Sequence, residues 1–201
     1  MTARIKAVVF DIGNVLLRWD PRLAFCPPLT PDAAEAFLAR TDFMARNLRA
    51  DAGARFADLA AEIADPRDRD LFSSYVARYA LTVPAAIEGT WQVLDRLRAR
   101  GLAIHAITNW SAETWPTGLA THPRLGTAFG VTVVSGQEGV IKPDPRIFAL
   151  FCERAGLAPG DCLFIDDSPA NVAGAKAFGI AAELFTTPEA LETALAARGL
   201  L

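Results

Sequence analysis

The most constraining feature of this chain is that short apolar segments alternate with amphipathic segments through its C-terminal part. The apolar segments have strand composition and cover residues 102–108, 131–135, 162–165 and 180–185. Helical spacing of apolar residues characterises the segments between and after them, at 88–100, 145–155, 169–178 and 188–198. Such alternation favours a parallel sheet covered by helices on both faces. We therefore predict an α/β fold with a doubly wound, Rossmann-like parallel sheet.

The N-terminal part contributes one further strand and a different kind of segment. Residues 5–10 read Ile-Lys-Ala-Val-Val-Phe, which is typical of a buried strand. Residues 18–86 are rich in Ala and Arg, and their apolar side chains recur at helical intervals. Within them, Thr30 is a typical helix N-cap, with Pro31 at the first helical position. We predict a core of residues 1–17 and 87–201 and a small helical cap domain inserted at 18–86.

Composition narrows the classes of function. The chain has 201 residues, of which 52% are hydrophobic, and a formal net charge of −3, so one sizeable core is expected. The sequence has no stripe of basic residues, so nucleic-acid binding is not expected. It also has no apolar stretch long enough to cross a membrane. The first strand follows Met1 closely, so we expect no signal peptide and a cytoplasmic protein with reduced cysteines at 26, 152 and 162. The partners left are small molecules, and the chain could be a monomer or a homodimer.

Polar residues follow four of the predicted strands. Asp11 comes directly after the first strand, and Thr108-Asn109 closes the strand from residue 102. Lys142 lies in the loop after 131–135, and Asp166-Asp167 follows the strand at 162–165. In a parallel sheet the carboxyl ends of all strands lie at one edge, so these side chains are expected to converge.

The residue types in this set suit phosphoryl transfer. A carboxylate can act as a nucleophile, and Mg²⁺ bound by carboxylates can bridge it to a negatively charged substrate. A lysine neutralises phosphoryl oxygens, while a Thr hydroxyl and an Asn amide can bind the remaining oxygen. Each element alone also has a structural interpretation, as a turn, a solvated lysine or a helix cap. The four together, in this order, favour a catalytic site.

With these motifs, nearly the whole chain resembles the haloacid dehalogenase-like hydrolase superfamily, in the branch (subfamily I) with a helical C1 cap after the first strand. The resemblance implies that Asp11 is the nucleophile, forming a covalent aspartyl intermediate, with Lys142 as the second catalytic residue. It implies phosphate binding by Thr108, Asn109 and Lys142. It implies a Mg²⁺ site formed by Asp11, the Gly13 carbonyl, Asp166 and Asp167.

The first motif departs from the common pattern of the superfamily. Most of its phosphatases read Asp-x-Asp-Gly-Thr, and the second Asp is the general acid and base. Here the run is Asp11-Ile12-Gly13-Asn14-Val15, which resembles a phosphatase-like subgroup with Phe-Asp-x-Gly-Asn-Val. Loss of a positioned acid typically costs about two to four orders of magnitude in rate. An acidic leaving group could compensate, a residue of the cap could replace the Asp, or turnover could be poor.

Several residues near the first motif are candidates for the substrate mouth or for the missing acid. Among the acids, Asp20 is the best placed in sequence, with Asp42 and Asp51 behind it, although an Asp-Pro turn is the favoured interpretation of Asp20. Arg18, Trp19, Arg22 and Trp110 could line the mouth, whereas His105 is expected to be a packed core residue. The segments 17–20 and 83–87 are expected to be the joints of a cap that closes over the site.

Three functions follow from this interpretation. The leading one is a Mg²⁺-dependent phosphatase that hydrolyses small phosphomonoesters, such as sugar phosphates or esters with an acidic leaving group, through a phospho-Asp11 intermediate. The first alternative is a 2-haloacid dehalogenase that uses Asp11 to displace halide, since the run from Lys142 to Arg146 resembles those enzymes. The paired acids at 166 and 167 favour the metal-dependent reaction. The second alternative is a metabolite- or protein-binding module with low activity.

Overall fold

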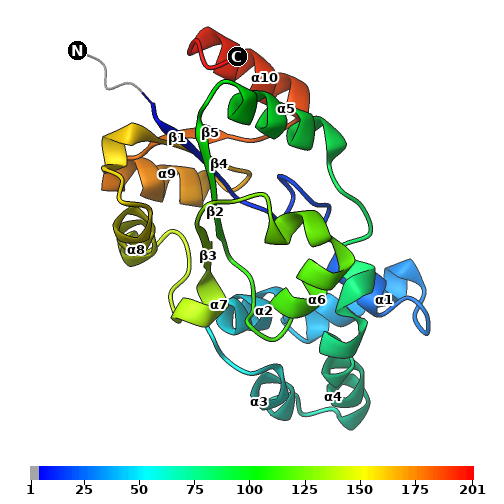
Figure 1. The fold of residues 1–201 in the computed structure, drawn as a ribbon. Coiled ribbons are helices and arrows are strands. Elements are labelled where there is room, and N and C mark those ends of the chain that lie inside the picture. Colours follow the sequence, from blue (N-terminus) through cyan, green and yellow to red (C-terminus); the bar gives the residue numbers. More distant parts are fainter. Residues whose placement is uncertain (1–4) are drawn as a thin grey trace.

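The computed structural model of this chain describes residues 5–201, and its centre is a five-stranded parallel sheet (Figure 1). The strands are β1 (Ala7–Phe10), β2 (Ala103–Thr108), β3 (Thr132–Val134), β4 (Cys162–Asp166) and β5 (Ala181–Leu184). Their order across the sheet is β3-β2-β1-β4-β5. Phe10 is paired with Ala106 on one side and with Ile165 on the other, so β1 occupies the middle. The predicted doubly wound α/β fold is confirmed.

Helices cover both faces of the sheet because alternate residues of β1 point in opposite directions. Val8 and Phe10 belong to the cluster that contains α5 (Glu88–Ala99) and α10 (Pro188–Ala197). Ala7 and Val9 belong to a second cluster with α8 (Pro145–Ala155) and α9 (Pro169–Phe178). Both faces are therefore buried, which explains why the strands read as continuous apolar runs.

The helices of the core begin and end close to the predicted positions. The side chains of Asp144 and Thr187 accept hydrogen bonds from the first turns of α8 and α10, with a proline next in each case. Gly156 and Gly179 adopt left-handed conformations at the ends of α8 and α9. The strand predicted at 131–135 is shorter, because Ser135 already begins the short helix α7 (Ser135–Glu138).

Between β1 and α5, every regular element within residues 18–86 is helical, and we call this segment the helical insertion. Its elements are the 3-10 helix η1 (Pro21–Ala24), α1 (Pro31–Arg40), α2 (Phe43–Asp51), α3 (Phe56–Ala61), α4 (Pro66–Ser73) and the 3-10 helix η2 (Val76–Thr82). The hydroxyl of Thr30 caps α1 as predicted. Phe25, Phe43 and Tyr75 form an aromatic core with ring centroids 4.8–5.8 Å apart.

Two chain segments connect the insertion to the sheet, and they lie side by side. Arg18 donates its backbone N–H to Ala85 over 2.9 Å, and Ile87 donates to Leu16 over 2.8 Å. The insertion also contacts the sheet side directly, where the Ser135 hydroxyl donates to the Asp51 carbonyl over 2.6 Å. The insertion therefore lies over the edge of the sheet where the strands end (Figure 1).

Two helices that the sequence patterns do not single out complete this edge. One is α2, which starts without a side-chain cap after Asp42, a residue in the left-handed conformation. The other is α6 (Trp115–Thr121), whose helical pattern is interrupted by Pro116 and Gly118. Two short 3-10 helices, η3 (Pro123–Gly126) and η4 (Pro159–Asp161), lie in the loops of the core. All of these form because tertiary contacts compensate for weak local signals.

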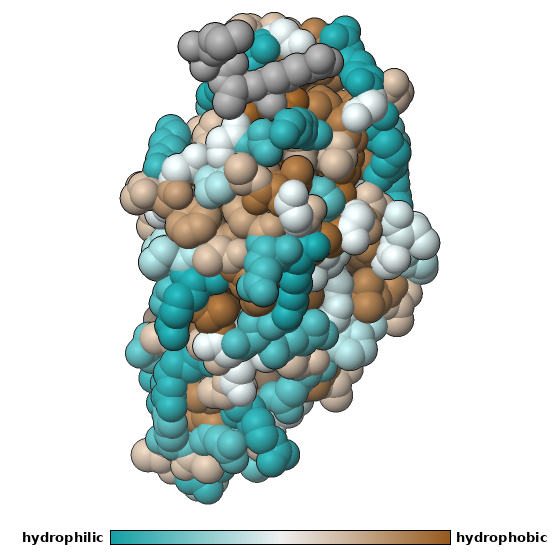
Figure 2. Space-filling model, turned by 60° about the vertical axis from the view of Figure 1, so that its left-hand side comes forward, coloured by the Kyte–Doolittle hydropathy of each residue, from teal (hydrophilic) through white to brown (hydrophobic). Residues whose placement is uncertain are grey.

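The surface carries few large apolar side chains. Among residues 5–201, the exposed ones are Met44, Leu48, Leu81 and Leu184. Figure 2 shows one face of the molecule, where hydrophobic residues are scattered among hydrophilic ones. None of the helices in this range combines the length and apolar character that a membrane crossing requires. The three cysteines are free thiols, as predicted.

Candidate active site

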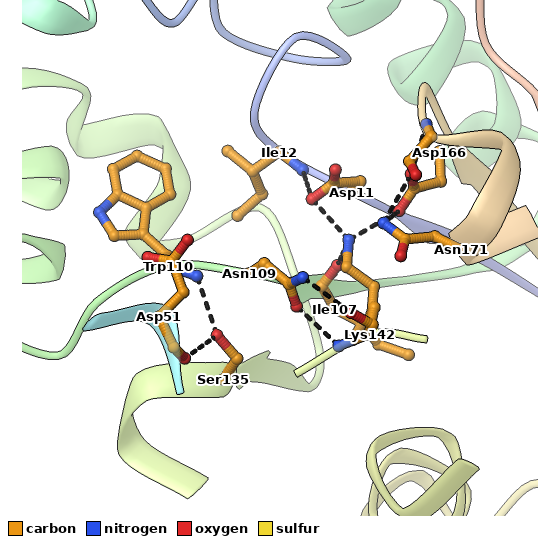
Figure 3. A network of polar contacts seen from close by, with 11 residues as sticks. Asp11, Ile12, Asp51, Ile107, Asn109, Trp110, Ser135, Lys142, Asp166 and Asn171 are labelled. Atoms are coloured by element: carbon orange, nitrogen blue, oxygen red, sulfur yellow. Dashed lines mark hydrogen bonds and ion pairs between the residues drawn. The ribbon is translucent and has the colours of Figure 1, made fainter. Parts of the chain in front are cut away.

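A fully buried lysine lies at the centre of the polar cluster where the strands end (Figure 3). The Nζ atom of Lys142 is 2.9 Å from Asp11 Oδ1 and 2.7 Å from Asp166 Oδ2. It also donates to the carbonyl of Ile107 over 3.0 Å. The topology therefore brings together residues from three loops that are far apart in sequence.

The carboxylate of Asp166, at the end of β4, accepts hydrogen bonds from the start of the following helix, α9. The Ser168 backbone N–H donates to Asp166 Oδ1 over 2.8 Å. The side-chain amide of Asn171 donates to both oxygens, over 3.0 and 3.1 Å. With the Lys142 contact, both oxygens of Asp166 are already engaged by protein donors. Asn171 is a site residue that the sequence patterns did not single out, and its signal is its place one turn into the helix after the acidic pair.

Negative charge exceeds positive charge in this cluster. Oxygens of Asp11, Asp166 and Asp167 all lie within 4.8 Å of one another, and Lys142 contributes one positive charge. Burial raises the pKa of Asp11 to about 7, against the attraction of Lys142, and Asp166 raises it further. Burial and the neighbouring Asp166 also raise the pKa of Asp167. A set of carboxylates with this excess of charge suits a hard divalent cation.

Thr108 and Asn109 end β2 at the same edge but have different surroundings. The Thr108 hydroxyl is buried and has no hydrogen-bond partner among residues 5–201. Buried hydroxyls are rarely left unpaired, so this one is available to a bound group. The Asn109 side chain, in contrast, donates to the Lys142 carbonyl over 3.1 Å and accepts from the Lys142 N–H over 2.8 Å. It positions the loop that carries the lysine.

A cavity of about 70 Å³ lies between the helical insertion and the core, beside this cluster. Its lining residues include Gly13, Asn109 and Trp110 from the core and Trp19, Asp51 and Tyr79 from the insertion. Position 13 faces open space, since a Cβ placed there would meet no atom within 4 Å. Asn14, not Gly13, adopts the left-handed conformation of the turn, with φ of 54°.

The structure separates the three candidate acids. Asp20 accepts three hydrogen bonds from Arg22 and caps η1, which matches the favoured structural interpretation. Asp42 is exposed. Asp51 alone of the three is buried and lines the cavity. Among the candidates for the missing acid, Asp20 ranks first by its closeness in sequence to the first motif. No local sequence signal points to Asp51, because its position depends on how α2 packs on the core.

The other residues considered for the mouth also differ in position. Trp19 and Trp110 line the cavity. Arg18 is exposed, and Arg22 pairs with Asp20 beside a separate depression. His105 is a packed residue, whose Nδ1 accepts from the Val131 N–H over 2.9 Å.

Comparison with known proteins identifies the family. The family model described as haloacid dehalogenase-like hydrolase matches residues 5–179. The chain belongs to the haloacid dehalogenase-like hydrolases. The matched range includes all of the residues in the buried cluster around Lys142, so the resemblance inferred from the motifs is confirmed at the level of the family.

Curated relatives within this family have diverse names. Flavin mononucleotide hydrolase 1 of Arabidopsis thaliana is 31% identical over 114 residues, which cover 57% of this chain and 46% of that protein. Protein CbbY of Rhodobacter capsulatus is 24% identical over 188 residues, covering 88% and 83%. Acyl-CoA dehydrogenase family member 10 of the mouse is 37% identical over 89 residues, 44% of this chain but 8% of that protein. The chain thus spans less than half of the first and third of these relatives.

Solved structures of the family share the fold. A family enzyme from Bacteroides thetaiotaomicron, in complex with magnesium and inorganic phosphate, has a TM-score of 0.66 and 20% identity, covering 91% of this chain and 95% of that one. L-2-haloacid dehalogenase from Xanthobacter autotrophicus has a TM-score of 0.64 and 23% identity, covering 98% and 84%.

Proposed function

We propose that this haloacid dehalogenase-like hydrolase is a Mg²⁺-dependent phosphatase that cleaves small phosphomonoesters through a phospho-Asp11 intermediate. The observation that carries the proposal is the buried Lys142 paired with Asp11 and Asp166, with the Asp167 carboxylate close by and an unpaired, buried Thr108 hydroxyl at the end of the neighbouring strand. The phosphatase names among the relatives support it.

The first step needs a carboxylate oxygen free to attack phosphorus. Asp11 Oδ1 is occupied by Lys142 and by the Ile12 N–H at 2.7 Å, which leaves Oδ2 as the nucleophile. As the Oδ2–P bond forms, the bond from phosphorus to the leaving oxygen breaks. Lys142 neutralises charge on the phosphoryl oxygens, and the Thr108 hydroxyl donates to one of them.

The residues that would hold Mg²⁺ are Asp11, the Gly13 carbonyl and Asp167. Asp166 already accepts hydrogen bonds at both oxygens, so Asp167 has the freer carboxylate and is the better direct ligand. When bound, the cation supplies charge that balances the excess of carboxylates and of phosphate oxygens.

The helical insertion acts as a cap in this proposal, with the joined segments near residues 17–20 and 83–87 as its hinge. A cavity of 70 Å³ would hold on the order of five water molecules. Opening of the cap would admit the ester, and closing it would exclude water during the reaction. Trp19 and Trp110 would then contact the leaving group.

A 2-haloacid dehalogenase is the second candidate, because solved dehalogenases share this fold over almost the whole chain. In that reaction Asp11 attacks carbon and halide leaves. The crowding of three carboxylates argues against it, since the negative charge would disfavour a carboxylate substrate in the absence of a cation.

The test is phosphate release from a panel of small phosphomonoesters, including anomeric sugar phosphates and acyl phosphates, with Mg²⁺ or with EDTA. We expect metal-dependent release that Asp11→Asn abolishes. Asp32→Asn is the matched control, since Asp32 is exposed in the first turn of α1. No release above that of Asp11→Asn on any ester would contradict the proposal, and halide release from 2-haloacids would then support the second candidate.

A further inference from the structure

Asp51 is placed where a carboxylate is unfavourable on three separate counts. It is buried, although aspartates are almost never buried unless paired. It is the last residue of α2, where the helix dipole disfavours negative charge. No lysine, arginine or histidine within residues 5–201 forms an ion pair with it. The Asn47 amide donates to its carboxylate over 2.9 Å.

The Asp51 side chain shares its cavity with position 13. Both line the space between the insertion and the core, and position 13 has no atom within 4 Å of where a Cβ would lie. The backbone of Asp51 is fixed to the core, because its carbonyl accepts from the Ser135 hydroxyl over 2.6 Å, and the same hydroxyl accepts from the Trp110 N–H (Figure 3). An acid on the insertion and an open position on the loop after β1 therefore line the same cavity.

We propose that Asp51 is the general acid and base of the reaction, in place of the acid that the chain lacks at position 13. This inference rests on the proposed phosphatase function and adds a catalytic residue to it. It also gives the cap a chemical role, because the acid reaches the substrate only when the insertion is closed on the core.

In the two chemical steps Asp51 gives up one proton and takes one back. As Asp11 attacks phosphorus and the ester P–O bond breaks, the protonated Asp51 carboxyl gives its proton to the leaving oxygen, which departs as an alcohol. Asp51, now a carboxylate, then takes a proton from the water that attacks phosphorus. The P–O bond to Asp11 breaks, inorganic phosphate leaves, and Asp51 is protonated again.

The surroundings of Asp51 agree with this double use. Burial raises its pKa to about 7, against a backbone hydrogen bond from Ser111; the charge of Asp11 adds to the rise and Lys142 opposes it. From the insertion, Tyr75 and Tyr79 are the titratable groups that face it, and both stay neutral because burial raises the pKa of each. An acid with a pKa near neutrality can both give and take a proton at neutral pH.

The experiment compares esters whose leaving groups differ in their need for an acid. Wild type and Asp51→Asn are mixed rapidly with p-nitrophenyl phosphate, which needs little protonation, and with glycerol 2-phosphate, which needs it. For Asp51→Asn we expect a burst of about one p-nitrophenol per enzyme followed by slow turnover. With glycerol 2-phosphate we expect the first turnover to slow by about 100- to 10,000-fold.

Two further variants separate a catalytic role from a structural one. Gly13→Asp, combined with Asp51→Asn, restores an acid facing the cavity and should recover at least about tenfold of the lost rate on glycerol 2-phosphate. Asp58→Asn, on the exposed side of α3, is the matched control and should leave both rates unchanged. Equal losses on both esters without a burst, or no rescue by Gly13→Asp, would overturn the assignment of Asp51. No phosphate release by the wild type from either ester would instead refute the proposed phosphatase.

Discussion

Replacing Lys142 by methionine tests whether one buried cation holds the cluster of carboxylates together. Methionine keeps most of the side-chain volume but removes the ammonium group, which lies 2.9 Å from Asp11 and 2.7 Å from Asp166. The side chains of Lys142 and Asp166 are fully buried, so water has little access to replace the ammonium group at Asp166. Removing one partner of a buried ion pair typically costs about 3–5 kcal/mol. The carbonyl of Ile107 loses its donor as well, for about 1–3 kcal/mol if it stays unpaired.

We expect Lys142→Met to lower the free energy of unfolding by at least about 3 kcal/mol in EDTA, measured by urea denaturation. Lys176→Met is the matched control, because Lys176 is exposed on α9, and its effect should stay within about 0.5 kcal/mol. Mg²⁺ should return part of the loss, since at about 100 times its dissociation constant a ligand adds about 2.7 kcal/mol.

A loss below about 1 kcal/mol for Lys142→Met in EDTA would refute the reasoning. It would mean that the lysine does not balance the charge of Asp11 and Asp166 in the folded protein. A loss of the expected size without any recovery in Mg²⁺ would support the ion cluster but contradict its use as a metal site.

Three other outcomes are expected. Thr108→Val should leave the free energy of unfolding within about 1 kcal/mol, because the hydroxyl has no partner among residues 5–201, but it should weaken inhibition by inorganic phosphate in a steady-state assay. Gly174→Ala places a Cβ 2.6 Å from the Cβ of Pro143, so it should displace the neighbouring loop that carries Lys142. We expect it to lower the free energy of unfolding by about 1–3 kcal/mol, measured by thermal unfolding, and to lower kcat. Gly126→Ala, the control, should change neither quantity. Asp51→Asn should reduce the pH dependence of the free energy of unfolding. The pKa of Asp51 rises on folding from 3.8 to about 7, so the folded state binds more protons than the unfolded state. The free energy of unfolding of the wild type should therefore fall by roughly 3–4 kcal/mol between about pH 4 and about pH 8 because of this residue. Urea unfolding at both pH values checks this, and an unchanged difference between them would count against a buried, ionisable Asp51.

The core and the edge that carries the candidate site are predictable from the sequence because their signals are local. The strands are short, mostly apolar runs; α8, α9 and α10 begin at a proline, and α8 and α9 end at a glycine. Once the strands are parallel, the residues after them must meet at one edge: Lys142 contacts Asp11 and Asp166, and Thr108 ends the neighbouring strand at the same edge.

The details of that edge depend on contacts between segments that are far apart in the chain. The sequence alone shows that Asn109 follows a strand, but only the folded loop ties its amide to the Lys142 backbone. The sequence alone also places Asp20 nearest to the first motif, whereas Asp51 is the acid that reaches the cavity. The difference arises because α2 is positioned by tertiary packing, through the contact of the Asp51 carbonyl with Ser135 in the core. A period of apolar residues determines which face of a helix is buried, but it carries no information about which distant loop that face will meet.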